Sequence, residues 1–249
     1  MKIGILGVGN IGATLARRLA AAGHDVRVAN SRGPETIPDE VLATGARAVH
    51  GRDLPDGLEA LVVSIPLARI PEIRPLVDAL PDDAVVLDTS NYYPARDGRV
   101  DALEDGQVES SWVAEQLGRP VVKAWNAILS QSFDAKDAPA GTPGRIAIPV
   151  AADAEAHRAL GASLVDETGF DGFDAGPLAD SWRQQPGTPA YCTDRTAEEL
   201  PGALAAADRA SSPRRRDLAM AVLVGLSEDP TATVDGDLVL GLNRLLYTA

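Results

Sequence analysis

The feature that most constrains this chain is a glycine-rich turn near its start. The turn follows an apolar run from Lys2 to Leu6 and precedes a helical pattern from about Ile11 to Ala22. A GxGxxG turn between a strand and a helix is typical of parallel α/β folds that bind dinucleotides, because free backbone N–H groups face the pyrophosphate there. The alternative is a turn that binds no ligand. We predict that the cofactor's phosphates are bound by Gly7, Gly9, Asn10, Ile11 and Gly12.

Alternation of strand-like and helical patterns continues after this turn. The strand-like segments are continuous apolar runs, which indicates strands covered on both faces. We therefore predict an α/β protein with a Rossmann-type, doubly wound, mostly parallel sheet. The further strands are expected at residues 25–29, 46–49, 60–64, 84–88, 121–124, 145–150 and 172–175.

The pattern changes after about Gly176. A segment with frequent proline and glycine is followed by helical patterns near residues 197–207, 213–226 and 238–247. We predict a dinucleotide-binding domain over residues 1–176 and a small C-terminal helical extension over residues 177–249. The extension is too short to bury a substantial core of its own.

The end of the second predicted strand indicates which dinucleotide is bound. A site for NAD places an acidic residue there to accept from the ribose hydroxyls, whereas a site for NADP places arginine. Here the strand runs into Asn30, Ser31 and Arg32, with no carboxylate. A guanidinium, a hydroxyl and an amide can all donate to a 2′-phosphate, so we predict NADP(H). The alternative for Arg32 is an ordinary solvated turn residue.

Ligands of an open parallel sheet lie at the carboxyl ends of its strands. We predict that Ser64, Ile65 and Pro66 contact the nicotinamide half of the cofactor. Aromatic side chains lie at the carboxyl ends of the next two predicted strands, although aromatics are only 4% of the chain. Flat aromatic rings suit a planar molecule that accepts a hydride from the cofactor. The alternative is that these rings belong to the hydrophobic core. The predicted catalytic residues are Tyr92, Trp125 and Asn126.

Lys123 precedes this last group and has two interpretations. It is either a general acid or a polar residue at a strand end. Hydride transfer between two rings needs chiefly correct placement, so the reaction does not require a strong acid from the protein.

Composition excludes several partners. The 36 acidic and 23 basic side chains give a net charge of −13, which disfavours nucleic acid and membrane surfaces. One cysteine and three scattered histidines show no spacing typical of zinc ligands, so no metal is expected. The apolar start is cut by glycines and indicates a strand rather than a signal peptide, and no apolar run is long enough to span a bilayer. The cytoplasm is the simplest compartment.

Five segments of the chain carry a family resemblance: the glycine turn and residues 30–32, 88–98, 121–126 and 174–178. Together they resemble the NADPH-dependent oxidoreductases typified by coenzyme F420-dependent NADP reductase. The resemblance implies a Rossmann fold, binding of NADP by Ser31 and Arg32, and frequent homodimers. It also implies a small-molecule redox acceptor, such as coenzyme F420 or a flavin. The segments after Trp125 and after Leu178 depart from the family pattern.

We further expect the acceptor to lie beside the Leu178–Arg183 segment, where Arg183 would bind an acidic tail.

Two other functions remain open. One is an NADP-dependent reductase of a small hydroxyacid or imine substrate, which normally uses a larger helical domain than this chain has. The other is a non-catalytic module that senses NADPH.

Overall fold

The computed structural model describes residues 1–230 and 232–248. Six parallel strands form one sheet in the order β3-β2-β1-β4-β5-β6. This confirms the α/β fold expected from the sequence. The strands are β1 (Lys2–Leu6), β2 (Asp25–Ala29), β3 (Arg47–Ala48), β4 (Ala60–Val63), β5 (Val85–Asp88) and β6 (Val121–Lys123).

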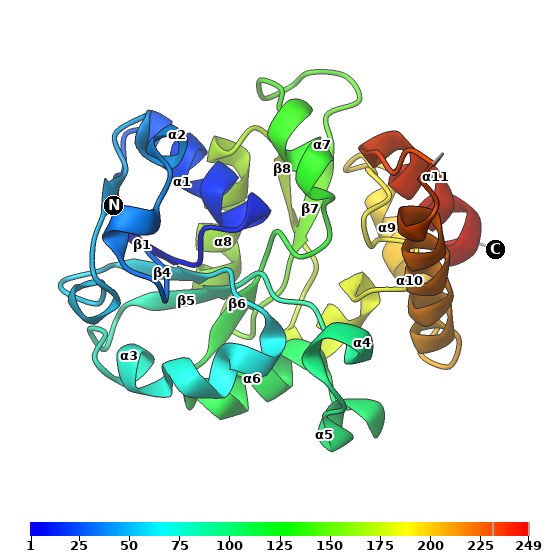
Figure 1. Ribbon diagram of the computed structural model, residues 1–249, viewed down its shortest axis with the longest axis horizontal. Coiled ribbons are helices and arrows are strands. Elements are labelled where there is room, and N and C mark those ends of the chain that lie inside the picture. Colours follow the sequence, from blue (N-terminus) through cyan, green and yellow to red (C-terminus); the bar gives the residue numbers. More distant parts are fainter. Residues whose placement is uncertain (231, 249) are drawn as a thin grey trace.

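Helices cover both faces of this sheet (Figure 1). The central strands are apolar on both sides because each face packs against helices, and every residue of β4 and β5 is buried. The helices of this part are α1 (Asn10–Ala21), α2 (Asp39–Leu42), α3 (Arg74–Asp78), α4 (Pro94–Asp97), α5 (Asp101–Glu104), α6 (Glu109–Leu117), α7 (Ser130–Ala135) and α8 (Glu155–Glu167). Short 3₁₀ helices occur at Pro34–Thr36, Gly51–Asp53, Leu67–Ile73 and Leu178–Gln184.

The last two strands, β7 (Ala147–Val150) and β8 (Asp171–Asp174), form a separate parallel pair. Their positions agree with the sequence prediction. They do not extend the main sheet in parallel, because the chain beyond β7 runs antiparallel to the end of β6. There the backbone N–H of Lys123 donates to the Ala151 carbonyl at 2.8 Å, and the N–H of Ala151 donates back at 3.0 Å.

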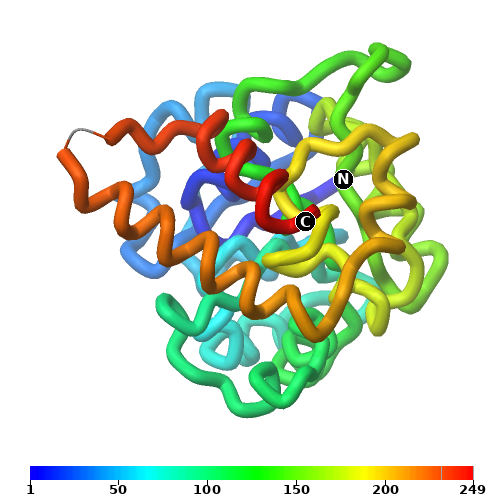
Figure 2. The backbone as a smooth tube through the Cα atoms, turned by 90° about the vertical axis from the view of Figure 1, so that its right-hand side faces the viewer, coloured from blue at the N-terminus to red at the C-terminus, as the bar shows by residue number. Residues whose placement is uncertain are grey.

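Three helices follow residue 199 and lie together at one side of the molecule (Figure 1). They are α9 (Leu200–Ala205), α10 (Ser212–Glu228) and α11 (Gly236–Tyr247). Figure 2 shows α10 (orange) and α11 (red) lying across the side of the molecule that is on the right in Figure 1. Tyr247 of α11 packs in a buried cluster with Ala127, which belongs to the loop after β6. The division at residue 176 stays a prediction.

Among residues 1–230 and 232–248, no helix combines the length and the apolar character needed to cross a lipid bilayer.

Candidate functional site

The glycine turn has the geometry that its spacing predicts. Gly7 has a φ of +101°, and a Cβ atom there would lie 2.2 Å from the carbonyl oxygen of Ser64. A Cβ on Gly12 would lie 2.0 Å from the carbonyl oxygen of Gly7. By contrast, apart from Gly9 itself and its neighbours in the chain, no atom of the described residues lies within 4 Å of the position that a Cβ on Gly9 would take. Gly7 and Gly12 are therefore required by the fold, whereas Gly9 leaves open space above the turn for a ligand.

Helix α1 starts directly after this turn and points its positive end at the same space. Its N-cap residue is Gly9, no side chain of the described residues caps the helix, and no acidic residue lies in its first turn. Helix N–H groups without intrahelical partners and the helix dipole favour an anion at this position. The turn and the helix together fit a pyrophosphate group.

The tip of β2 lies beside this turn, since Ala29 pairs with Leu6 in the sheet. The side-chain oxygen of Asn30 accepts hydrogen bonds from the N–H groups of Arg32 and Gly33, each at 2.9 Å. Its amide group donates to Thr36. Asn30 therefore shapes the turn, and its predicted contact with a phosphate stays a prediction.

Ser31 and Arg32 are exposed at the same tip. Within the described part of the chain, neither side chain has a hydrogen-bond or ion-pair partner, and no acidic residue ends β2. Both side chains are therefore accessible to a ligand, and their binding of a 2′-phosphate stays a prediction.

A cleft of about 370 Å³ lies at the carboxyl edge of the sheet. The glycine turn and the segments after β4, β5 and β6 converge there, as expected for this fold. Ser64 and Ile65 line the cleft, whereas Pro66 starts a 3₁₀ helix and is not among the lining residues. The lining residues are Gly9, Asn10, Ile11, Ser64, Ile65, Thr89, Ser90, Asn91, Tyr93, Arg96, Trp125, Asn126, Ile128, Leu129, Ser130, Tyr191 and Cys192.

The indole ring of Trp125 lies in the protein core. Its side chain is 1% exposed, it belongs to the main hydrophobic cluster, and its N–H donates to Thr168 Oγ1 at 3.2 Å. The prediction of Trp125 as a catalytic aromatic wall is therefore corrected in favour of the core alternative. The backbone at Trp125 is strained, with a φ of +55° in a non-glycine residue.

Tyr92 faces the opposite side of its segment from the cleft. Its hydroxyl donates to Glu104 at 2.8 Å and accepts from the N–H of Val100 at 3.0 Å. The predicted catalytic role of Tyr92 is corrected for this reason. Neighbouring residues of an extended chain point to opposite sides, so Tyr93 is the tyrosine that reaches the cleft.

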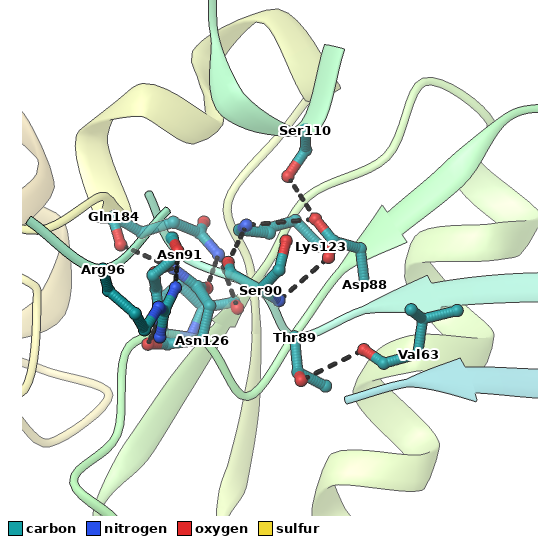
Figure 3. Close-up of polar contacts among 11 residues, drawn as sticks. Val63, Asp88, Thr89, Ser90, Asn91, Arg96, Ser110, Lys123, Asn126 and Gln184 are labelled. Carbon is teal, nitrogen blue, oxygen red and sulfur yellow. Dashed lines mark hydrogen bonds and ion pairs between the residues drawn. The ribbon is translucent and has the colours of Figure 1, made fainter. Parts of the chain in front are cut away.

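Asn126 is held in a network of three carboxamides. Its amide donates to Asn91 Oδ1 at 3.1 Å and to the Gln184 carbonyl at 2.8 Å, while its own oxygen accepts from the Gln184 amide at 2.9 Å (Figure 3). Because both amide hydrogens are used, Asn126 positions the wall of the cleft. A direct role in catalysis stays a prediction.

Lys123 is completely buried beneath the same wall. Its ammonium group is directed at Asp88 and at the Ser90 carbonyl, 2.5 Å away, while Ser110 of α6 donates to the same Asp88 carboxylate at 2.9 Å (Figure 3). Lys123 is not among the cleft residues, and this geometry favours the interpretation as a polar strand-end residue.

Two residues that line the cleft were not predicted from the sequence. Tyr191 and Cys192 line it, although they follow its other residues by more than sixty positions and carry no motif. Burial raises the pKa of the Cys192 thiol, which disfavours the reactive thiolate form.

Glu109 was missed for a similar reason. It begins α6 and is 5% exposed, and its Oε2 atom has no hydrogen-bond partner among the described residues. Burial raises the pKa of this carboxyl to about 7, against a smaller lowering by Lys123. Nothing in the local sequence distinguishes Glu109 from an exposed glutamate in the first turn of a helix.

The segment after Leu178 does not form the expected wall. The guanidinium of Arg183 lies 4.5 Å from the ring centroid of Trp182, and it donates to the carbonyl of Leu204. Only Gln184 reaches the wall, through Asn126. The expected contact of Arg183 with the acceptor stays a prediction, and of the described residues after position 177 it is Tyr191 and Cys192 that line the cleft.

For metals, the residues that the structure describes contain no group of three His, Cys, Asp or Glu side chains arranged to hold an ion.

Residues 2–92 match a protein family described as NADP oxidoreductase, coenzyme F420-dependent. Protein YjhV of Escherichia coli (strain K12) is 40% identical over 93 residues, which are 37% of this chain and 68% of that protein. The crystal structure of protein SMa0349 from Sinorhizobium meliloti matches with a TM-score of 0.66 and 27% identity, covering 79% of this chain and 95% of that chain. A crystal structure from Arthrobacter sp. FB24, described as an F420-dependent NADP reductase, matches with a TM-score of 0.59 and 22% identity. It covers 73% of this chain and 87% of that chain, and at this identity it supports the fold alone.

Proposed function

Because the chain belongs to the family of coenzyme F420-dependent NADP oxidoreductases, we propose that it transfers a hydride between NADP(H) and a planar acceptor such as coenzyme F420 or a flavin. The observation that carries the proposal is the juxtaposition of an uncapped helix start with an unpaired arginine at the neighbouring strand tip. The first fits a pyrophosphate, and the second fits the 2′-phosphate that distinguishes NADP from NAD.

The chemistry of the residues present fits this cofactor. Gly9 leaves room at the turn, and the exposed Ser31 and Arg32 would hold the extra phosphate. The cofactor, when bound, supplies or receives a hydride at the nicotinamide ring. The ring would lie in the cleft beside Ser64 and Ile65.

Side chains of the cleft would place the acceptor against that ring. Ser90, Asn91 and Arg96 are among the polar residues that line the cleft. The carboxamide network around Asn126 keeps the wall rigid. Rigid placement of two rings at near-attack distance is the main requirement for hydride transfer between them.

The competing functions lose support from the same geometry. A hydroxyacid or imine reductase that used Lys123 as its acid would need that ammonium group in the cleft, yet it is buried against Asp88. A non-catalytic sensor would not need a cleft beyond the cofactor site. The expected homodimer stays a proposal, to be measured by the mass of the protein in solution.

Anaerobic mixing of the NADPH-loaded protein with coenzyme F420, FMN and a set of cyclic imines tests the proposal. We expect NADPH to be oxidised by coenzyme F420 or FMN and not by the imines. Tight NADPH binding without oxidation by any acceptor would support the sensor instead.

A further inference from the structure

The hydroxyl groups of Tyr93 and Tyr191 meet at the cleft, with their oxygen atoms 2.7 Å apart. Both residues line the cleft, as does Cys192. Tyr93 follows β5 in the Rossmann sheet, whereas Tyr191 precedes α9 and is 98 residues later in the chain. The segment before the C-terminal helices therefore supplies part of the cleft's polar surface.

Counting hydrogens shows that this cluster has a donor to spare. Tyr93 and Tyr191 carry one hydroxyl hydrogen each and share one hydrogen bond. If Tyr191 donates to Tyr93, the Tyr93 O–H has no acceptor among the described residues. A ligand acceptor atom beside Tyr93 favours this direction, because it gives that hydrogen a partner.

The two hydroxyl groups are suited to donating hydrogen bonds. Burial raises the pKa of both tyrosines, most strongly through loss of solvent around the phenols. Each phenol therefore keeps its proton at neutral pH. The guanidinium of Arg96 lies 5.4 Å from the centroid of the Tyr93 ring and holds that ring in place.

We propose that Tyr93, oriented by Tyr191, donates a hydrogen bond to the atom of the acceptor that becomes negatively charged when the hydride arrives. This inference rests on the proposed function. It narrows the acceptors to planar molecules in which the reduced ring atom is conjugated with a carbonyl or imine group. Deazaflavins and flavins have this arrangement.

The reaction balances as follows. The hydride leaves the nicotinamide of NADPH, which becomes NADP⁺, and forms a new bond to the reduced ring atom of the acceptor. The π electron pair of that ring atom moves to the conjugated oxygen or nitrogen, which then takes one proton from solvent. Tyr93 stabilises the negative charge and keeps its own proton, so the acceptor gains two electrons and two hydrogens in total.

The test uses three matched substitutions that each remove one phenol oxygen. Tyr93→Phe is expected to lower kcat about 100-fold, as the loss of one preorganised donor typically does, with the dissociation constant of NADPH unchanged. Tyr191→Phe is expected to lower kcat less. Tyr247→Phe is the control, because Tyr247 packs on Tyr191 with ring centroids 6.4 Å apart but is not among the cleft residues.

A second readout needs no turnover. The absorption spectrum of oxidised coenzyme F420 or FMN is recorded on binding to the NADP⁺-loaded protein. The wild type and the Tyr247→Phe variant should give the same shift, and the Tyr93→Phe variant should lose the part due to the hydrogen bond. Equal rates and spectra for the Tyr93→Phe and Tyr247→Phe variants would overturn the inference and leave the proposed function intact. If the wild type reduces no acceptor, the proposed function fails and this inference fails with it.

Discussion

The Nζ atom of Lys123 lies 3.1 Å from the Oδ2 atom of Asp88, and neither side chain is exposed to solvent. The two residues end neighbouring strands and are paired in the sheet register. The same ammonium group donates to the carbonyl of Ser90, which is where the wall of the cleft begins. The buried ion pair thus fixes the backbone of the candidate site from below.

Replacing Lys123 by Met tests this positioning role. The variant leaves a buried carboxylate at Asp88 without its cation, which is expected to cost about 3–5 kcal/mol of the free energy of unfolding. The double variant Lys123→Met/Asp88→Asn should recover part of this loss, because a neutral amide is cheaper to bury. Urea unfolding measures both. If the Lys123→Met variant keeps wild-type stability but shows no turnover, the result would instead support acid catalysis by Lys123.

Two glycines of the turn should respond differently to Ala. A Cβ on Gly12 would clash with the Gly7 carbonyl, so Gly12→Ala should lower the free energy of unfolding by about 2 kcal/mol. Gly9 has an extended backbone with a φ of −72° and open space around it, so Gly9→Ala should keep wild-type stability. NADPH affinity should nevertheless fall about tenfold or more, because the methyl group occupies the ligand's space. Thermal unfolding and fluorescence titration with NADPH separate the two effects. Unchanged NADPH affinity in Gly9→Ala would contradict the cofactor site.

The guanidinium of Arg32 should decide between the two nicotinamide dinucleotides. Loss of a charged hydrogen bond typically costs about 2 kcal/mol, so Arg32→Ala should raise the dissociation constant of NADPH roughly 30-fold and leave that of NADH unchanged. Arg47→Ala is a matched control, because Arg47 is exposed at the start of β3 and pairs with Asp25 at the start of β2. Equal losses for NADPH and NADH would show that Arg32 does not bind the 2′-phosphate.

Glu109 should make stability depend on pH. Its carboxyl has a pKa of about 7 in the folded protein, above its ordinary value of 4.5, because burial disfavours the charged form. Between these values the folded state binds more protons than the unfolded state, so stability falls as pH rises from about 4.5 to 7 and then levels off. The loss is on the order of 3 kcal/mol. Glu109→Gln should remove it, which urea unfolding at pH 5 and pH 8 can check. A wild-type pH dependence that persists in this variant would assign it to another group.

The glycine turn illustrates how far local sequence can be used. Its spacing, together with the flanking strand and helix, predicted positions that the structure reproduces, because backbone sterics at Gly7 and Gly12 act over a few residues. The position of Arg32 at the strand tip was also predictable, because it depends on a short stretch of chain. The role of the Asn30 side chain was not predictable, because this side chain closes its own turn and only the folded turn shows this.

The aromatic residues show where local sequence becomes insufficient. Tyr92 and Trp125 were both expected to contact the acceptor because of their places at strand ends. Which side of an extended segment faces the cleft is set by the packing of the layers around it. That packing turns Tyr92 toward Glu104 and places the indole of Trp125 in the core.

The order of strands and helices, the cofactor turn and the free arginine beside it were determined by the sequence alone, because each depends on apolar periodicity or on backbone geometry over a short stretch. The walls of the cleft were decided only by the tertiary structure. Tyr93 meets Tyr191, and Lys123 meets Asp88, across gaps of 98 and 35 residues. Such contacts arise when the layers pack, and no local pattern of residues encodes them.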